Sequence, residues 1–131
     1  MSNVGIVRDI YAAFERGDMA AVLGLMADDI VWNEAESFPY SDRNPYVGPQ
    51  AVLEGVFGRV GGEWNVFAVE PERFIDGGET VVMLGRYRLE HKVGRREIKP
   101  QVVHVWAVRN GKLASFQQYI DTLAVAQAMS A

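Results

Sequence analysis

The feature that most constrains the fold is a hairpin near the C-terminus. Residues 102–121 form two runs of alternating side chains, joined by Asn110-Gly111. Asn and Gly both adopt the positive φ that a two-residue type I′ turn requires, so the spacing predicts two antiparallel strands. Counting outwards from the turn gives the opposed pairs, which are Arg109–Lys112, Val108–Leu113, His104–Gln117 and Val102–Tyr119.

Opposed residues share one face of a sheet, so this register predicts which side chains lie together. One face collects large apolar groups with titratable and hydrogen-bonding ones: Val102, His104, Trp106, Ser115, Gln117, Tyr119 and Asp121. A plain core does not need those polar groups, whereas a ligand pocket does. This face is therefore predicted to line a binding pocket.

The composition excludes several classes of function. With 131 residues, a single domain over residues 1–131 is expected, with residues 122–131 as a short helical tail. The net charge is −4 and no basic block dominates, which argues against nucleic-acid binding. There is no cysteine, no apolar run long enough for a membrane span and no secretory pattern at the N-terminus, so a cytoplasmic location is expected. The two histidines lack the spacing of metal ligands and no glycine loop suits a phosphate, so we expect no metal and no cofactor.

The order of elements predicts an α+β fold. Helical apolar stripes cover residues 3–16 and 18–26, and a third helix starts at Pro49 and is expected to end at Gly61-Gly62. A short strand is expected over residues 30–34, and long strands over residues 64–75, 80–90 and 98–121. Residues 35–47 form a long loop that carries Phe38, Tyr40 and Tyr46. Long loops in small domains often bind ligands. Helices packed on one face of a curved sheet are the expected architecture.

Four segments follow one another in a characteristic order and spacing. They are Tyr11-Ala12-Ala13-Phe14-Glu15-Arg16-Gly17-Asp18, Met26-Ala27-Asp28-Asp29-Ile30-Val31-Trp32, Gly48-Pro49-Gln50-Ala51-Val52 and Val108-Arg109-Asn110-Gly111-Lys112-Leu113. Together they resemble the SnoaL-like and ketosteroid-isomerase-like families of the nuclear-transport-factor-2-like, or cystatin-like, superfamily. The resemblance implies a cone-shaped α+β barrel, in which a curved mixed sheet wraps around about three helices and an apolar pocket. It also implies frequent homodimers. The fold hosts isomerases, cyclases, hydrolases, dehydratases and non-catalytic binding domains, so it does not fix the function.

Three residues are candidates for catalysis. Alternation places Glu34 on the same face as Ile30 and Trp32, and the resemblance places it where ketosteroid isomerases carry their general base. The resemblance also places His104 near an oxyanion-stabilising position, and Asp121 where SnoaL-like cyclases carry a catalytic aspartate. Each has a structural alternative: an exposed acid at a strand end for Glu34, a partly buried histidine bonded to Gln117 for His104, and an ordinary acid at a strand end or a helix cap for Asp121.

The chain also departs from the isomerase pattern. The oxyanion tyrosine of those enzymes falls at Ile10, and Tyr11, one position away, is expected to point elsewhere. The many aromatic residues favour a flat, apolar ligand. The candidate ligand-binding residues are Trp32, Phe38, Tyr40, Tyr46, Phe57, Trp64, Tyr87, Trp106, Gln117 and Tyr119.

Two functional hypotheses follow. The first is a cofactor-free isomerase or cyclase that transfers protons on a small carbonyl or polyketide-like compound, with Glu34 or Asp121 as base. The second is a non-catalytic small-molecule-binding or dimerisation domain. The expected partners are a small apolar or aromatic molecule and a second copy of the chain.

Overall fold

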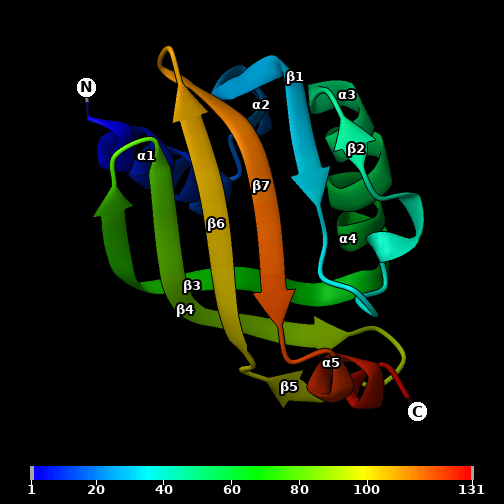
Figure 1. The fold of residues 1–131 in the computed structure, drawn as a ribbon. Coiled ribbons are helices and arrows are strands. Elements are labelled where there is room, and N and C mark those ends of the chain that lie inside the picture. Colours follow the sequence, from blue (N-terminus) through cyan, green and yellow to red (C-terminus); the bar gives the residue numbers. More distant parts are fainter. Residues whose placement is uncertain (1, 131) are drawn as a thin grey trace.

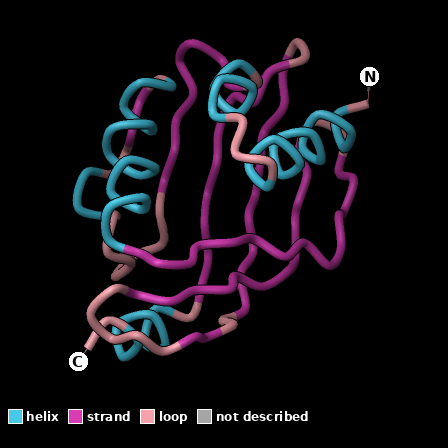
Figure 2. The backbone as a smooth tube through the Cα atoms, turned by 180° about the vertical axis from the view of Figure 1, so that it is seen from behind, coloured by secondary structure: helices cyan, strands magenta, loops and turns pink. Residues whose placement is uncertain are grey.

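A computed structural model describes residues 2–130, in which one curved sheet carries most of the helices on one side, and the C-terminal helix lies at one end of the sheet (Figures 1 and 2). The helices are α1 (Asn3–Glu15), α2 (Met19–Gly24), η1 (Ser41–Arg43), α3 (Pro49–Val52), η2 (Leu53–Phe57), α4 (Gly58–Glu63) and α5 (Thr122–Ala128). The strands are β1 (Met26–Asn33), β2 (Tyr46–Val47), β3 (Trp64–Gly77), β4 (Thr80–His91), β5 (Glu97–Ile98), β6 (Gln101–Arg109) and β7 (Lys112–Ile120).

The sheet is mixed and strongly curved, which confirms the predicted fold class. Its strands follow the order β2-β1-β7-β6-β4-β3, and β5 pairs with β4. Among the strand pairs of the described residues, only β1 and β7 run parallel. Within residues 2–130, β2 and β3 end this path without pairing to each other, so the sheet does not close into the expected barrel. Its concave side faces α1, α2 and the α3–α4 segment (Figure 2).

The N-terminal helices begin where the sequence predicts. Ser2 accepts a hydrogen bond from the Gly5 N–H and caps α1, while Asp18 accepts one from Ala21 and caps α2. The apolar stripe of α1 buries Ile6, Val7 and Ile10 against the sheet. None of the described helices is both long and apolar enough to cross a membrane.

The third helix runs further than expected and changes its winding. Gly61 and Gly62 do not end it, because α4 continues to Glu63. Between α3 and α4, Leu53–Phe57 forms a π-helical turn, which turns Val56 and Phe57 towards the sheet. Such turns occur often at functional sites.

The predicted register of the C-terminal hairpin is correct only beside its turn. Arg109 pairs with Lys112 and Val108 with Leu113, but a bulge follows and Ala107 pairs with Ser115. Beyond the bulge the partner of His104 is Gln118, rather than Gln117. An extra residue in one strand moves the side chain of each later residue in that strand to the opposite face of the sheet. Gln117 and Tyr119 therefore point away from the helices, and Phe116 and Gln118 point towards them.

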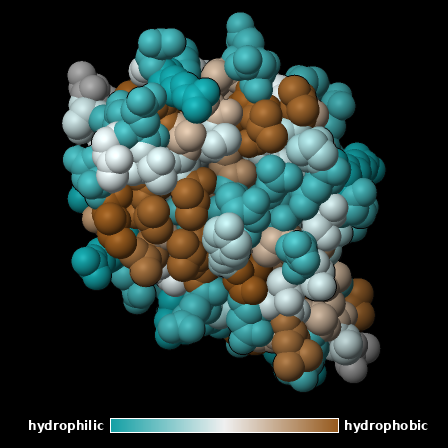
Figure 3. Space-filling view, viewed as in Figure 1, coloured by the Kyte–Doolittle hydropathy of each residue, from teal (hydrophilic) through white to brown (hydrophobic). Residues whose placement is uncertain are grey.

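The outer face of the sheet carries a patch of apolar side chains. Cross-strand pairing places Ile75 beside Val82 and Val105, and Leu84 beside Val103 and the exposed Tyr119. Figure 3 shows apolar residues gathered on this face, over β4 and β6. We call these six residues the outer-face patch.

The C-terminal helix packs against the turn that follows β4. Asp121 caps α5 by accepting a hydrogen bond from the Ala124 N–H. Arg96 donates to the carbonyl oxygens of Gln127 and Ser130. A Cβ atom added at Gly94 would lie 1.8 Å from the carbonyl oxygen of Ala128, so the backbones approach too closely for any side chain.

Gly94→Ala is expected to lower the free energy of unfolding by about 1–3 kcal/mol, because α5 or the turn must move to make room for the methyl group. Urea unfolding followed by circular dichroism measures the change. The matched control is Gly61→Ala in α4, where a Cβ atom would meet nothing within 4 Å. That variant is expected to be neutral or more stable by up to about 1 kcal/mol. Equal effects of the two substitutions would contradict the close approach.

Candidate functional site

A small cavity lies between the sheet and the helices. Its volume is about 50 Å³, which is enough for a few water molecules. Aromatic and aliphatic side chains from α1, η2, β3 and β7 form most of its wall, and the polar groups are few: Tyr11, Glu34, Tyr87, His104 and Gln118. This combination of an apolar wall and convergent polar groups is typical of a ligand site.

The cavity adjoins a surface groove between α1 and β3. Tyr11, Phe14 and Phe67 line both, and Arg88 and Glu70 lie on the outer part of the groove. Side chains of α1 and β3 therefore form the boundary between the cavity and the groove.

An aromatic stack forms the wall beside the acid. Trp32 pairs with Phe116 across β1 and β7, and their ring centroids lie 3.8 Å apart. Phe116 in turn pairs with Trp106 on β6, at 4.7 Å between centroids. Because β7 lies between β1 and β6, its register brings the three rings together on the concave side.

Glu34 is a buried acid at the end of β1. Its side chain is 3% exposed, and its carboxylate accepts one hydrogen bond, from the indole N–H of Trp32 at 3.1 Å. Burial raises the pKa of Glu34 to about 7, against the smaller lowering effects of the Trp32 hydrogen bond and the charge of Arg59. A carboxyl group with a pKa near 7 exchanges protons readily at neutral pH.

His104 lies at the centre of a hydrogen-bonded network. Its Nδ1 is 2.7 Å from the hydroxyl of Tyr11, and its Nε2 is 2.6 Å from the hydroxyl of Tyr87. Trp106 donates to the Tyr11 oxygen at 2.9 Å, and Gln118 donates to the Tyr87 oxygen at 2.9 Å. Burial lowers the pKa of His104 to about 3 and raises those of Tyr11 and Tyr87 above their usual range, so all three groups are neutral at pH 7.

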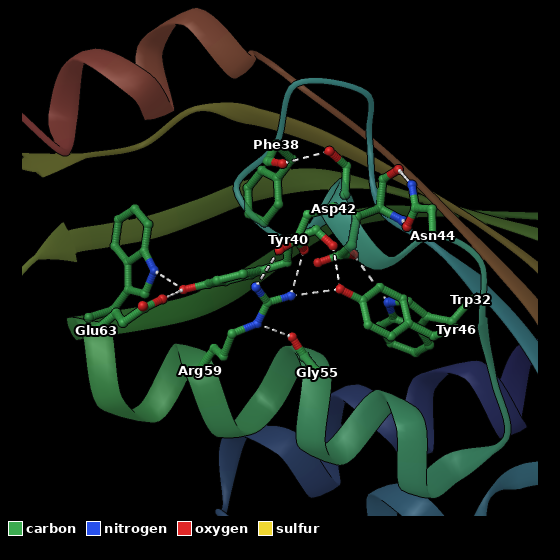
Figure 4. Close-up of polar contacts among 12 residues, drawn as sticks. Trp32, Phe38, Tyr40, Asp42, Asn44, Tyr46, Gly55, Arg59 and Glu63 are labelled. Atoms are coloured by element: carbon green, nitrogen blue, oxygen red, sulfur yellow. Dashed lines mark hydrogen bonds and ion pairs between the residues drawn. The ribbon is translucent and has the colours of Figure 1, made fainter.

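The loop that follows β1 is held by Arg59 of α4 (Figure 4). The guanidinium forms two hydrogen bonds with Asp42 at 2.8 and 2.9 Å, donates to the Tyr46 hydroxyl at 2.8 Å, and lies over the ring of Tyr40. Its Nε donates to the Gly55 carbonyl in the π-helical turn. One arginine thus ties the loop to the wall of the cavity.

The same loop fixes the backbone of Glu34. The side chain of Asn44 accepts from the Glu34 N–H at 3.0 Å and donates to the Glu34 carbonyl at 2.8 Å. Tyr40 is held separately, by Glu63 and by the Trp64 indole. Loop residues therefore position the acid without lining the cavity themselves.

The structure brings two of the three candidate catalytic residues to the cavity. Glu34 and His104 line it, whereas Asp121 is exposed and caps α5. Four of the candidate ligand-binding residues line the cavity: Trp32, Phe57, Tyr87 and Trp106. Six do not. Gln117 and Tyr119 lie on the outer face because of the bulge, and the aromatic residues Phe38, Tyr40, Tyr46 and Trp64 are buried in and around the loop.

Sequence reasoning missed five residues that matter to the cavity: Tyr11, Phe14, Phe67, Phe116 and Gln118. Tyr11 was expected to point elsewhere, yet its hydroxyl binds His104. For two of these residues the sequence contained a usable signal. Tyr11 belongs to the apolar stripe of the first helix. Leu113 and Phe116 are apolar residues three positions apart, and both can be buried on the same face of a strand only if a bulge lies between them.

Replacement of Glu34 by glutamine is expected to stabilise the protein at high pH. The pKa of Glu34 is higher in the folded than in the unfolded chain, so its ionisation costs stability as the pH rises from about 4.5 through about 7. Glu34→Gln is expected to gain about 2–3 kcal/mol at pH 8 and almost nothing at pH 4.5. Urea unfolding at both pH values measures this. The control is Glu36→Gln, an exposed acid two residues away, and an equal gain in the two variants would refute the assignment.

Comparisons with known proteins agree with the fold. The profile of the SnoaL-like domain family matches residues 7–116. A nuclear-transport-factor-2-like protein from Burkholderia thailandensis is 36% identical, with a TM-score of 0.94 over 100% of this chain and 99% of the other. A protein of unknown function from Burkholderia pseudomallei is 31% identical, with a TM-score of 0.90 over all of both chains.

A third nuclear-transport-factor-2-like protein, from Burkholderia xenovorans, is 32% identical, with a TM-score of 0.82 over 98% of this chain and 95% of the other. No curated protein of known function matches this chain. The family match covers most of the sequence and agrees with the predicted resemblance. The chain belongs to the SnoaL-like domain family, within the nuclear-transport-factor-2-like superfamily with the cystatin-like fold.

Proposed function

We propose that this protein is a cofactor-independent enzyme that transfers a proton at the carbon next to a carbonyl group in a small apolar compound. The observation that carries the proposal is Glu34, a carboxyl group with a pKa of about 7 in an apolar cavity. A group with that pKa is suited to both take up and return a proton near neutral pH.

The roles follow from the geometry of the cavity. Glu34 is the base, because it is the acidic side chain among the lining residues. The hydroxyl group of Tyr11 or of Tyr87, which His104 bridges, donates to the carbonyl oxygen, on which negative charge develops as the proton leaves. The apolar wall excludes water and strengthens both interactions.

Asp121 has no part in this proposal, since it is exposed and occupied in capping α5. The fold family includes isomerases and cyclases, which supports an enzyme of one of these classes. Of the two functional hypotheses, the catalytic one is favoured by the raised pKa of Glu34, which a purely structural acid does not need.

One structural neighbour suggests a first ligand to test. TerC, which has been co-crystallised with polyporic acid, is 23% identical to this chain, with a TM-score of 0.87. At that identity the likeness concerns the fold alone. Polyporic acid is therefore a starting compound for binding assays rather than an expected substrate.

The direct test is hydrogen–deuterium exchange on a simple ketone. Cyclopentanone in D₂O, followed by proton NMR, is expected to exchange its α-hydrogens faster with the wild-type protein than without it. Glu34→Gln is expected to lower this rate by about 10²-fold or more, the usual range for losing a general base. The matched control is Asp121→Asn, which keeps the helix cap and should exchange at the wild-type rate. Equal rates for wild type and Glu34→Gln would reject the proposal and favour a binding domain.

The proposed assembly is a homodimer formed through the outer-face patch. Contiguous apolar patches on a sheet surface mark interaction sites, and two copies of one patch are self-complementary about a two-fold axis. The support is the row of Ile75, Val82 and Val105 across three neighbouring strands.

Val105→Glu is expected to convert the dimer to a monomer, because it places a charge at the centre of the patch. Light scattering after size-exclusion chromatography measures the mass. The control is Val93→Glu, on an exposed turn outside the patch, which should leave the dimer unchanged. A wild-type protein that is monomeric throughout would disprove the assembly.

A further inference from the structure

The hydrogen bonds around His104 determine how many hydrogens its network can give to a ligand. The Ala35 N–H donates to Gln118 Oε1 at 3.0 Å, which fixes the orientation of the Gln118 amide. Gln118 Nε2 therefore donates to the Tyr87 oxygen. At the other end, the indole N–H of Trp106 can only donate, so the Tyr11 oxygen accepts.

Each tyrosine oxygen thus accepts one bond from a fixed N–H and still has its own hydrogen to donate. His104 stands between them, and within residues 2–130 its two ring nitrogens form hydrogen bonds with these two hydroxyl groups and with no acidic side chain. Because the ring is also buried, the imidazole is neutral. A neutral imidazole has one N–H and one bare nitrogen.

The partner of each hydroxyl and imidazole hydrogen in the network can now be assigned. One tyrosine donates its hydrogen to the bare nitrogen, and the other accepts from the imidazole N–H. The second tyrosine now accepts two bonds, so its oxygen has no lone pair left and its hydrogen has no partner within the network. A buried donor without a partner is unfavourable in an apolar cavity.

We propose that the Tyr11–His104–Tyr87 network presents a single hydroxyl hydrogen to the cavity, and that the ligand places an oxygen acceptor, such as a ketone carbonyl, against it. The inference rests on the proposed function and specifies the polar group that its ligand must carry. A ligand that needs the hydroxyl groups of both tyrosines as donors at once is excluded.

The tautomer of His104 selects which tyrosine donates. With the hydrogen on Nδ1, Tyr11 receives it and its own hydroxyl is free, next to the groove between α1 and β3. With the hydrogen on Nε2, the hydroxyl of Tyr87 is free instead, in the fully enclosed part of the site. One network therefore serves a carbonyl group at either end of the cavity.

The count also predicts the effect of removing one hydroxyl. Tyr11→Phe or Tyr87→Phe removes one hydroxyl hydrogen together with its bond to His104, so one hydrogen of the remaining tyrosine–histidine pair stays available in each variant. The substitution also frees the N–H of Trp106 or of Gln118, respectively, which adds a donor and does not remove one. The alternative is a network in which the same tyrosine always donates to the ligand. In that case the ligand loses its donor when this tyrosine is replaced and keeps it when the other tyrosine is replaced.

The test compares cyclopentanone with methylenecyclopentane, which has the same shape but no oxygen, by calorimetry at pH 7. The wild-type protein is expected to bind the ketone about tenfold more tightly, corresponding to one hydrogen bond. Tyr11→Phe and Tyr87→Phe are each expected to keep this preference. Equal binding of the two compounds by the wild type, or loss of the preference in only one variant, would overturn the proposal.

A second measurement needs no substitution at the site. Nitrogen-15 NMR of histidine-labelled protein at pH 7 is expected to find one protonated and one bare ring nitrogen in His104, with His91→Gln used to assign the signals. Two protonated nitrogens would free both hydroxyl groups and refute the single-donor count.

The experiments separate this proposal from the proposed function. Glu34→Gln is expected to abolish exchange on cyclopentanone while leaving the preference for the ketone intact. A ketone preference without any exchange in the wild type would reject the enzyme and keep the donor network. Exchange in the wild type without a preference for the ketone would keep the enzyme and reject the donor network.

Discussion

The register of β7 is the constraint on which the site depends. This strand lies between β1 and β6, so its pairing decides which residues of all three meet on the concave side. The bulge beside Ala107 shifts that pairing by one residue and brings Phe116 and Gln118 inwards. Without the bulge, Gln118, which donates to the Tyr87 hydroxyl, would lie on the outer face. Phe116 would then no longer lie between Trp32 and Trp106. A single inserted residue thus creates both the aromatic wall and one end of the network.

The polar groups of the cavity impose opposite dependences of stability on pH. The pKa of Glu34 is raised by burial, so this group costs stability as the pH rises through about 7. The pKa of His104 is lowered by burial, so its contribution is present above about 6.5 and is lost as the pH falls towards about 3. Both effects have one cause, the removal of titratable groups from water. A sequence selected for stability alone would fill this space with apolar side chains.

The sequence predicts the elements well because each is encoded by local patterns. Alternation placed Trp32 and Glu34 correctly on the concave side of β1, and the apolar stripe placed α1. The bulge is a long-range property of two paired strands, so counting from the turn put Gln117 and Tyr119 in the wrong place. Tyr11 was misjudged for a different reason: the family pattern put the tyrosine position one residue earlier, and helix geometry alone does not reveal which neighbour a long side chain reaches.

The aromatic residues of the loop after β1 could not be assigned correctly from the sequence. Phe38, Tyr40 and Tyr46 are as buried as the lining of a pocket, but their partners are Arg59 and each other rather than the cavity. Because Arg59 is bound at once to the loop and to Gly55 in the π-helical turn, opening the site at this end would break several hydrogen bonds together. At the other end, side chains of α1 and β3 separate the cavity from the groove by packing, without such a set of hydrogen bonds: Phe14, Phe67 and Val69 line both, together with Tyr11. Opening the site is therefore less costly at this end than at Arg59.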